Sequence, residues 1–262
     1  MAFGFGSRIT APALLSAGGG GGGFDPSMLT ITAGRLRSWW KNGTATMNTM
    51  SDGSGVSPGA GDPIGLIVSE ALESTFDLAM ETSSNKGTKT ADGPYFDTIF
   101  EGLWNSGLPQ YVVPGTTGLT VAFRFKSTNA AGGVTDYFLF GARDNVGGGP
   151  ATKAANGICL SSDGKLYMGV DSGNGIAYDP GDVYDTFCTV VGVWNPAVSD
   201  KLKLYFNSDT PSATATTALS GYLERVIMQG SGGAGITISG WFFCAEAFGD
   251  ADVANLRVWL EG

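Results

Sequence analysis

Apolar and polar residues alternate along several segments in the middle of the chain. In residues 118–126 every second position from Leu119 to Phe125 is apolar, and residues 201–206 alternate in the same way with two lysines on the other side. This period of two is typical of a strand with one buried face. Residues 186–194 are nearly all apolar, which predicts a central strand that is covered on both faces.

Further segments of this kind follow one another with Gly, Asn, Asp and Pro between them, so we expect a series of strands joined by turns. These segments are residues 136–142, 157–160, 165–170, 222–228 and 236–248. Between two of them stands Asp163-Gly164, a pair that favours a tight hairpin turn. Many short strands with turns between them predict an all-β fold.

The pattern changes to a helical period at the end of the chain. Val253, Leu256 and Leu260 recur at spacings of three and four residues, which places them on one face of a helix. We therefore expect a short amphipathic helix over residues 251–260, with Asp250 as its N-cap.

The beginning of the chain differs from the rest. Small and apolar residues fill positions 1–17, and six glycines follow, from Gly18 to Gly23. Because polyglycine is a flexible coil without side chains to pack, we divide the chain into an N-terminal anchoring arm, 1–23, and one domain, 24–262. The alternative is a disordered tail. We expect the arm to extend over a partner protein, which it would bind through its large apolar residues, Phe3, Phe5, Ile9, Leu14 and Leu15.

Composition narrows the class of protein. A chain of 262 residues suits one large sandwich domain, and 42 glycines suit many tight turns. The net charge of −9 argues against a nucleic-acid surface, and no apolar run approaches the roughly 20 residues that a membrane span needs. We expect Cys159, Cys188 and Cys244 to be buried reduced thiols, because they form no Cys-x-x-Cys pair.

Several blocks, taken in order, resemble the concanavalin A-like lectin/glucanase superfamily, in the laminin G-like form that tailed phages often encode. The blocks are residues 36–40, 61–65, 100–108, 192–195, 204–207, 238–248 and 249–253. The resemblance covers roughly residues 35–262 and implies a two-sheet antiparallel jelly-roll sandwich with a short C-terminal helix and an extended N-terminal arm. The chain departs from the family in the third block, where Trp104, Asn105 and Ser106 stand in place of paired aspartates.

Catalytic chemistry finds little support in the sequence. The chain contains no histidine, which excludes Ser-His-Asp and Cys-His sites. In the glucanase branch of the superfamily the catalytic acids stand on one strand as Glu-x-Asp-x-x-Glu or a close variant of it. Four glutamates of this chain lack an aspartate two residues further on. Those glutamates are Glu70, Glu101, Glu224 and Glu246. We therefore expect a protein that is not an enzyme.

Two kinds of binding site are candidates. Asp179, Asp182 and Asp185 are spaced by three residues in a loop with Pro180 and Gly181, and oxygen ligands on such a loop suit calcium, although a solvated acidic turn would have the same composition. No cofactor other than calcium is expected. Sugar binding would need exposed aromatic rings, for which the candidates are Trp104, Tyr178, Tyr184 and Trp194, and the sequence does not show which of these are exposed.

The resemblance and the absence of a basic secretory signal at the N-terminus predict a phage virion structural protein made in the host cytoplasm. It would be a head decoration, fibre or tail-associated subunit that binds capsid or tail proteins through its arm and forms homo-oligomers. A carbohydrate-binding host adhesin is the alternative, and a glycoside hydrolase is third.

Overall fold

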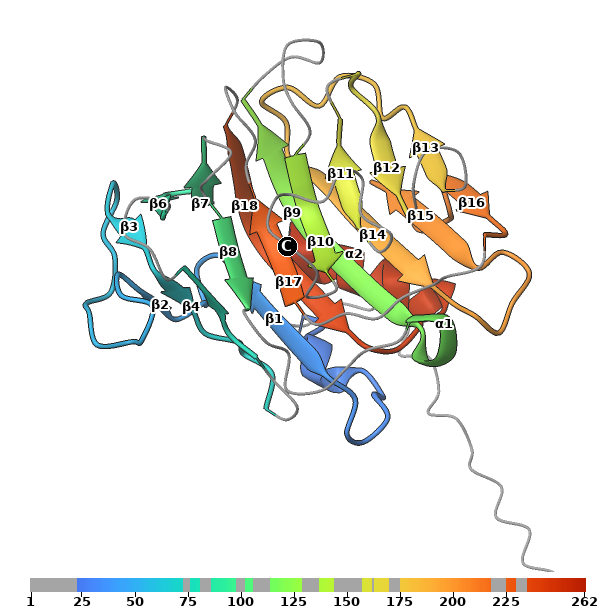
Figure 1. Cartoon of the computed structure of the whole chain (residues 1–262), viewed down its shortest axis with the longest axis horizontal. Helices are drawn as coiled ribbons and strands as arrows, with labels where there is room; N and C mark the ends of the chain where they lie inside the picture. Colours follow the sequence, from blue (N-terminus) through green and yellow to red (C-terminus); the bar gives the residue numbers. More distant parts are fainter. Residues whose placement is uncertain are drawn as a thin grey trace, which may run out of the picture.

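Two antiparallel β-sheets face each other in a computed structural model of the chain (Figure 1). The structure describes residues 23–72, 76–80, 86–97, 102–105, 114–128, 137–143, 157–161, 163–169, 175–217, 225–229 and 235–262. For residues 102–105, 114–115, 137–143 and 225–229 it describes the backbone alone. The five apolar residues predicted to anchor the arm, from Phe3 to Leu15, lie outside the described residues.

The first sheet, sheet A, contains the longest strands of the described chain. Its order is β16 (Ala213–Ala215), β15 (Leu202–Phe206), β14 (Cys188–Trp194), β9 (Leu119–Ser127), β18 (Ile236–Cys244), β7 (Gly93–Phe96), β6 (Gly87–Thr90) and β3 (Pro63–Ile64), with β1 (Arg37–Lys41) also beside β18. Strand β18 has room for two neighbours on one edge, because its first residues pair with β7 and its last five with β1.

The second sheet, sheet B, is built largely from shorter strands. Its order is β13 (Ile176–Tyr178), β12 (Leu166–Met168), β11 (Ile158–Leu160), β10 (Tyr137–Arg143), β17 (Arg225–Gln229), β8 (Gly102–Asn105), β5 (Leu78–Ala79), β4 (Leu66–Ile67) and β2 (Met47–Asn48). The predicted all-β antiparallel sandwich is confirmed, and so is each predicted strand within a few residues. The hairpin at Asp163-Gly164 is confirmed too, since β11 and β12 pair across it.

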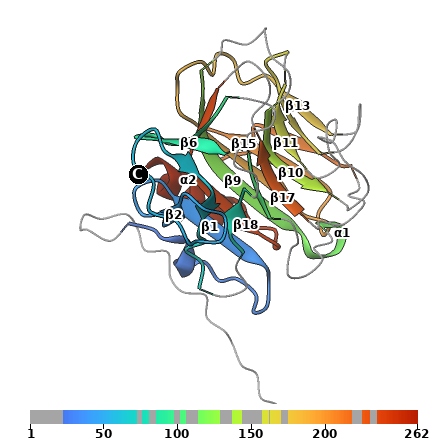
Figure 2. The same ribbon diagram turned by 60° about the vertical axis from the view of Figure 1, so that its left-hand side comes forward.

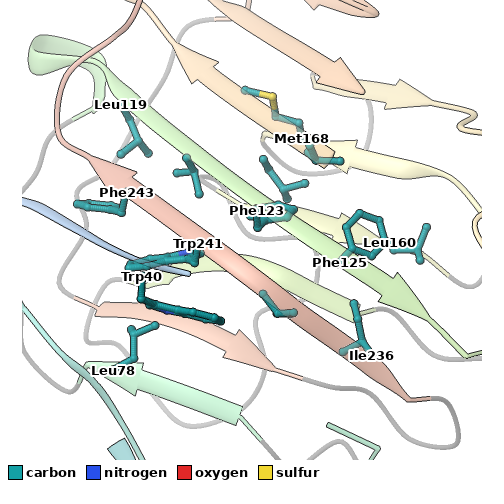
Figure 3. Packing of buried hydrophobic residues seen from close by; sticks show 14 of the residues in the cluster. Trp40, Leu78, Leu119, Phe123, Phe125, Leu160, Met168, Ile236, Trp241 and Phe243 are labelled. Atoms are coloured by element: carbon teal, nitrogen blue, oxygen red, sulfur yellow. The ribbon is translucent and has the colours of Figure 1, made fainter. Parts of the chain in front are cut away.

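The main core lies between the two sheets. The alternate residues from Leu119 to Phe125 on β9 are all buried in it, as the period of two predicted. Figure 3 shows Trp40 and Trp241 within this core, and Trp241 stacks on Phe243 at 6.0 Å between ring centroids. A large aromatic ring of this kind buries enough apolar surface to contribute several kcal/mol, at about 25 cal/mol per Å².

A second core lies on the outer face of sheet A, beneath helix α2 (Asp250–Glu261). Figures 1 and 2 show the helix against this sheet, and Val253, Leu256 and Leu260 are buried there. Strand β14 contributes to both cores, because Val190 packs between the sheets and Val191 packs under the helix. All seven residues of β14 are accordingly buried, as predicted.

The ends of helix α2 are held by side chains from the sheet. At the C-terminal end, Lys41 Nζ donates to the Trp259 carbonyl at 2.6 Å, and Arg124 donates to the Leu260 and Glu261 carbonyls at 3.1 and 2.8 Å. Cations at this end also complement the helix dipole.

Among the described residues, no helix has the length and apolar character required for a membrane crossing.

The predicted N-cap of this helix was wrong. Gly249 occupies the cap position and makes no side-chain cap bond, while Asp250 is the first helical residue. The Asp250 carboxylate instead accepts hydrogen bonds from the Tyr205 hydroxyl at 2.6 Å and Lys203 Nζ at 2.9 Å. Tertiary partners therefore take the carboxylate that would otherwise have capped the helix.

The segment from Phe24 to Thr32, which we call the strap, joins this second core. It contains the short helix η1 (Pro26–Met28), and Phe24, Leu29 and Ile31 pack partly buried against the residues under α2. At its end, Thr32 donates to the Glu246 carboxylate from both its main-chain nitrogen (2.9 Å) and its hydroxyl (2.8 Å). The strap thus ties Phe24 and the residues after it to the second core and to Glu246.

The three cysteines are free and buried, as predicted. Burial raises the pKa of the Cys244 thiol to about 12, since desolvation disfavours the thiolate. The Cys244 thiol is therefore a small apolar core group with little nucleophilic character.

Candidate functional site

One loop with an exposed aromatic ring lies where the chain passes from sheet B to sheet A. Residues 179–187, which we call the Tyr184 loop, connect β13 to β14. The loop runs beside the end of β9, because Tyr184 forms a bridge with Ser127 and the Asp185 main-chain nitrogen donates to the Ser127 carbonyl at 2.8 Å. The end of the longest central strand therefore positions this loop.

The Tyr184 loop is ordered by its own polar groups. The Asp179 carboxylate accepts from the Gly181 main-chain nitrogen at 2.9 Å, and the Asp182 carboxylate accepts from that of Tyr184 at 2.9 Å. These are local turns of the kind that aspartate favours. Asp185 takes a left-handed conformation with φ of 47°, which aspartate tolerates better than most residues.

Tyr184 is half exposed to solvent. The residue is 50% exposed, and it is the one aromatic among the large apolar residues that are exposed in the described part of the chain. A half-exposed ring on a preordered loop can stack on a flat ligand without a large entropic cost, because tyrosine has few rotatable bonds.

Charged groups from two other elements adjoin this loop. Lys126 on β9 makes ion pairs with Asp92, in the turn between β6 and β7, at 2.7 Å and with Asp185 at 3.6 Å. The hydrogen bond to Asp92 raises the pKa of Lys126 above its usual range. The ring of Phe187 lies beneath two cations, 5.1 Å from Lys126 Nζ and 4.9 Å from Arg124 Cζ, distances at which cations are attracted to an aromatic face.

The three aspartates predicted to hold calcium are not brought together as a cation site. In the residues that the structure describes, no group of three or more His, Cys, Asp or Glu side chains could hold a metal ion. Asp179 and Asp182 each bond to the loop backbone, and Asp185 faces Lys126. Calcium binding at this loop stays a prediction.

The four aromatic residues considered for sugar binding differ in their exposure to solvent. Trp194 is completely buried, Tyr178 packs against Phe206 at the edge of the main core with ring centroids 5.8 Å apart, and only the backbone of Trp104 is described. Tyr184 alone of the three with described side chains is exposed. Lys126 and Asp92 were not predicted from the sequence, because only the fold brings them to this loop, and the contact of Phe187 with Lys126 and Arg124 depends on the fold in the same way.

Two of the four glutamates that the sequence offered for hydrolysis have structural partners. Glu70 accepts from the Thr44 hydroxyl at 2.8 Å, and Glu246 receives Thr32, while Glu101 and Glu224 lie outside the described residues. Asp92 and Asp185 both pair with the ammonium group of Lys126.

Comparison with known proteins identifies the type of fold and does not assign a family. No family model and no curated protein matches the chain. The ligand-binding domain of botulinum neurotoxin serotype D, in complex with N-acetylneuraminic acid, superposes with a TM-score of 0.52 and 9% identity, over 84% of this chain and 50% of that chain. Botulinum neurotoxin type C, whose cell entry depends on interaction with two ganglioside molecules, matches at a TM-score of 0.42 and 14% identity, over 55% and 36%.

The chain therefore spans about half or less of each of these two neurotoxin structures. At 9% identity the likeness is one of fold alone: an antiparallel β-sandwich.

Proposed function

We propose that this chain is a non-enzymatic, glycan-binding module of a phage virion structural protein. The observation that carries the glycan-binding role is Tyr184, half exposed on a loop that its own hydrogen bonds hold in place. Aromatic rings with a few nearby polar groups are typical of small-molecule sites, and carboxylates accept hydrogen bonds from hydroxyl groups. The complex of the serotype D neurotoxin domain with N-acetylneuraminic acid supports a sugar as the class of ligand.

The positions of the strap and the Tyr184 loop support a role in display. Tyr184 adjoins Ser127 at the end of β9. Thr120, near the start of β9, donates to the main-chain oxygen of Glu246 at 2.8 Å, and the Glu246 carboxylate holds the strap through Thr32. Thr120 and Ser127 are seven residue steps apart along β9, which corresponds to about 23 Å at about 3.3 Å per step.

A module attached through its N-terminus would therefore present the Tyr184 loop on the side away from the attachment. In the proposed virion protein, the apolar arm of residues 1–23 binds capsid or tail proteins, and the sandwich faces outward as a head decoration, fibre or tail-associated subunit. Copies in a homo-oligomer or on a particle would strengthen weak sugar contacts through avidity. The same arrangement would serve a host adhesin, so the two candidate functions share one binding site.

The absence of catalysis is part of the proposal. Asp92 and Asp185 share Lys126, and their side chains are 48% and 68% exposed. We therefore assign this pair a structural role, in which Lys126 joins the turn at Asp92 to the Tyr184 loop.

The test is glycan binding by the whole chain and by a Tyr184→Ala variant. On an array of oligosaccharides, we expect the wild-type protein to bind and the variant to lose at least about tenfold in affinity, since a central tyrosine commonly contributes more than about 1.4 kcal/mol to an interface. The matched control is Tyr167→Ala, which removes a tyrosine on β12 whose hydroxyl donates to Asp163 at 2.6 Å. Wild-type binding by Tyr184→Ala, or equal loss in both variants, would refute the proposed site.

A further inference from the structure

We infer that the Tyr184 loop selects neutral, hydroxyl-rich sugars and discriminates against sugars that carry a carboxylate. The inference rests on the proposed glycan-binding role and adds the chemical class of the glycan. It differs from the ligand of the serotype D neurotoxin domain, which is N-acetylneuraminic acid. Three features of the loop carry it: an exposed tyrosine, exposed carboxylates close to it in the sequence, and cations that are already engaged.

The loop itself has only negative charges. Residues 179–187 contain three aspartates and no lysine or arginine. Asp182 and Asp185 flank the exposed ring of Tyr184 in the sequence and are themselves exposed, and the side chain of Asp185 is 68% exposed. A sugar stacked on Tyr184 would therefore have carboxylates as its nearest charged neighbours.

The two cations beside the loop have other partners. Lys126 Nζ lies between Asp92 at 2.7 Å and Asp185 at 3.6 Å, so its charge is more than balanced. Arg124 turns to the end of helix α2, where it donates to the carbonyls of Leu260 and Glu261. Recognition of a carboxylate needs a lysine or, better, the two-pronged contact of an arginine, and this arrangement offers neither at the ring.

The carboxylates of the loop suit hydroxyl groups instead. Asp182 uses one oxygen to accept a hydrogen bond from the Tyr184 main chain, and an ionised carboxylate has about four acceptor positions in all. The remaining positions can accept hydrogen bonds from sugar hydroxyls. An ionised sugar acid placed there would bring two carboxylates together without a proton or a cation between them, which is unfavourable.

The experiment compares matched glycan pairs on the full-length protein. Each pair is a neutral oligosaccharide ending in galactose and the same oligosaccharide capped with N-acetylneuraminic acid, titrated in solution and printed on an array. We expect the capped member to bind at least about fivefold more weakly, the factor that corresponds to one like-charge contact at about 4 Å in water. We expect this ratio to shrink at about 1 M salt, where the screening length falls to about 3 Å.

A charge-neutral variant identifies the source of the discrimination. The double variant Asp182→Asn and Asp185→Asn keeps an oxygen that can accept the Tyr184 main-chain bond and a residue type that tolerates the left-handed conformation at position 185. We expect its ratio to fall below about twofold. The matched control, Asp52→Asn with Asp200→Asn, removes two exposed charges outside the Tyr184 loop and should keep the wild-type ratio.

The outcomes separate this inference from the proposed function. Equal or tighter binding of the acid-capped sugars, or a ratio that the double variant leaves unchanged, would overturn the selection for neutral sugars while the glycan-binding role stands. Binding of no glycan at all by the wild-type protein would overturn the glycan-binding role, and this inference with it.

Discussion

The strap offers a quantitative test of where the folded domain begins. Leu29 and Ile31 are partly buried against the residues under helix α2. Truncation of a fully buried Leu or Ile to Ala costs about 2–5 kcal/mol, and for a partly buried side chain we take about half of that. For the double variant Leu29→Ala and Ile31→Ala we therefore expect a loss of about 2–5 kcal/mol in the free energy of unfolding. In a domain of this size such a loss corresponds to a fall in Tm of roughly 4–20 °C.

The assay is urea denaturation followed by tryptophan fluorescence, because Trp39 and Trp259 belong to the same core as the strap. Met28→Ala is the matched control within the strap. Met28 is 65% exposed, so its truncation should change stability by less than about 0.5 kcal/mol. The double variant could instead unfold at the wild-type urea concentration, or Met28→Ala could lower the free energy of unfolding by as much as the double variant. Either result would contradict a specific contribution of the strap to the fold.

Two further predictions concern a buried polar contact and the arm. Tyr205→Phe removes the hydroxyl that bonds Asp250, so we expect a loss of about 1 kcal/mol at neutral pH. The bonds from Tyr205 and Lys203 hold the pKa of Asp250 below its ordinary value of 3.8, so this contribution is present above that pH and lost as the pH falls through the lowered pKa. Denaturation curves at pH 7 and pH 3 should show the difference from wild type narrowing in acid, and a constant difference would refute it. A chain that starts at Phe24 should fold with wild-type stability but fail to join the virion; incorporation at the wild-type level would contradict the proposed role of the arm.

The fold was predictable where the chain makes a strand long enough to show a pattern. Strand β9 has nine residues with a clear period of two, and β14 has seven consecutive buried residues. Strands β3, β4 and β5 have two residues each, which is too short for any period, so nothing in the sequence marked them. Helix α2 was predicted from its apolar spacing, but its N-cap was not, because Tyr205 and Lys203 come from a distant strand.

The candidate site was only partly predictable for a related reason. Tyr184 was one of four aromatic candidates; the apolar run of residues 186–194 already predicted that Trp194 would be buried, but the sequence contained no sign that Tyr184 would stand exposed while Tyr178 packed against the core. Burial depends on the sheet to which a residue belongs and on what covers that sheet. Likewise, Lys126 and Asp92 lie 34 residues apart in the sequence, so their pairing beside Asp185 follows from the order of the strands.

The most direct test of the central claim is a crystal structure of the full-length protein with the neutral oligosaccharide that binds best on the array. We predict that a sugar ring lies on the face of Tyr184 and that at least one of its hydroxyl groups donates a hydrogen bond to Asp182 or Asp185. A sugar bound elsewhere on the sandwich, with the ring of Tyr184 still open to solvent, would contradict the account.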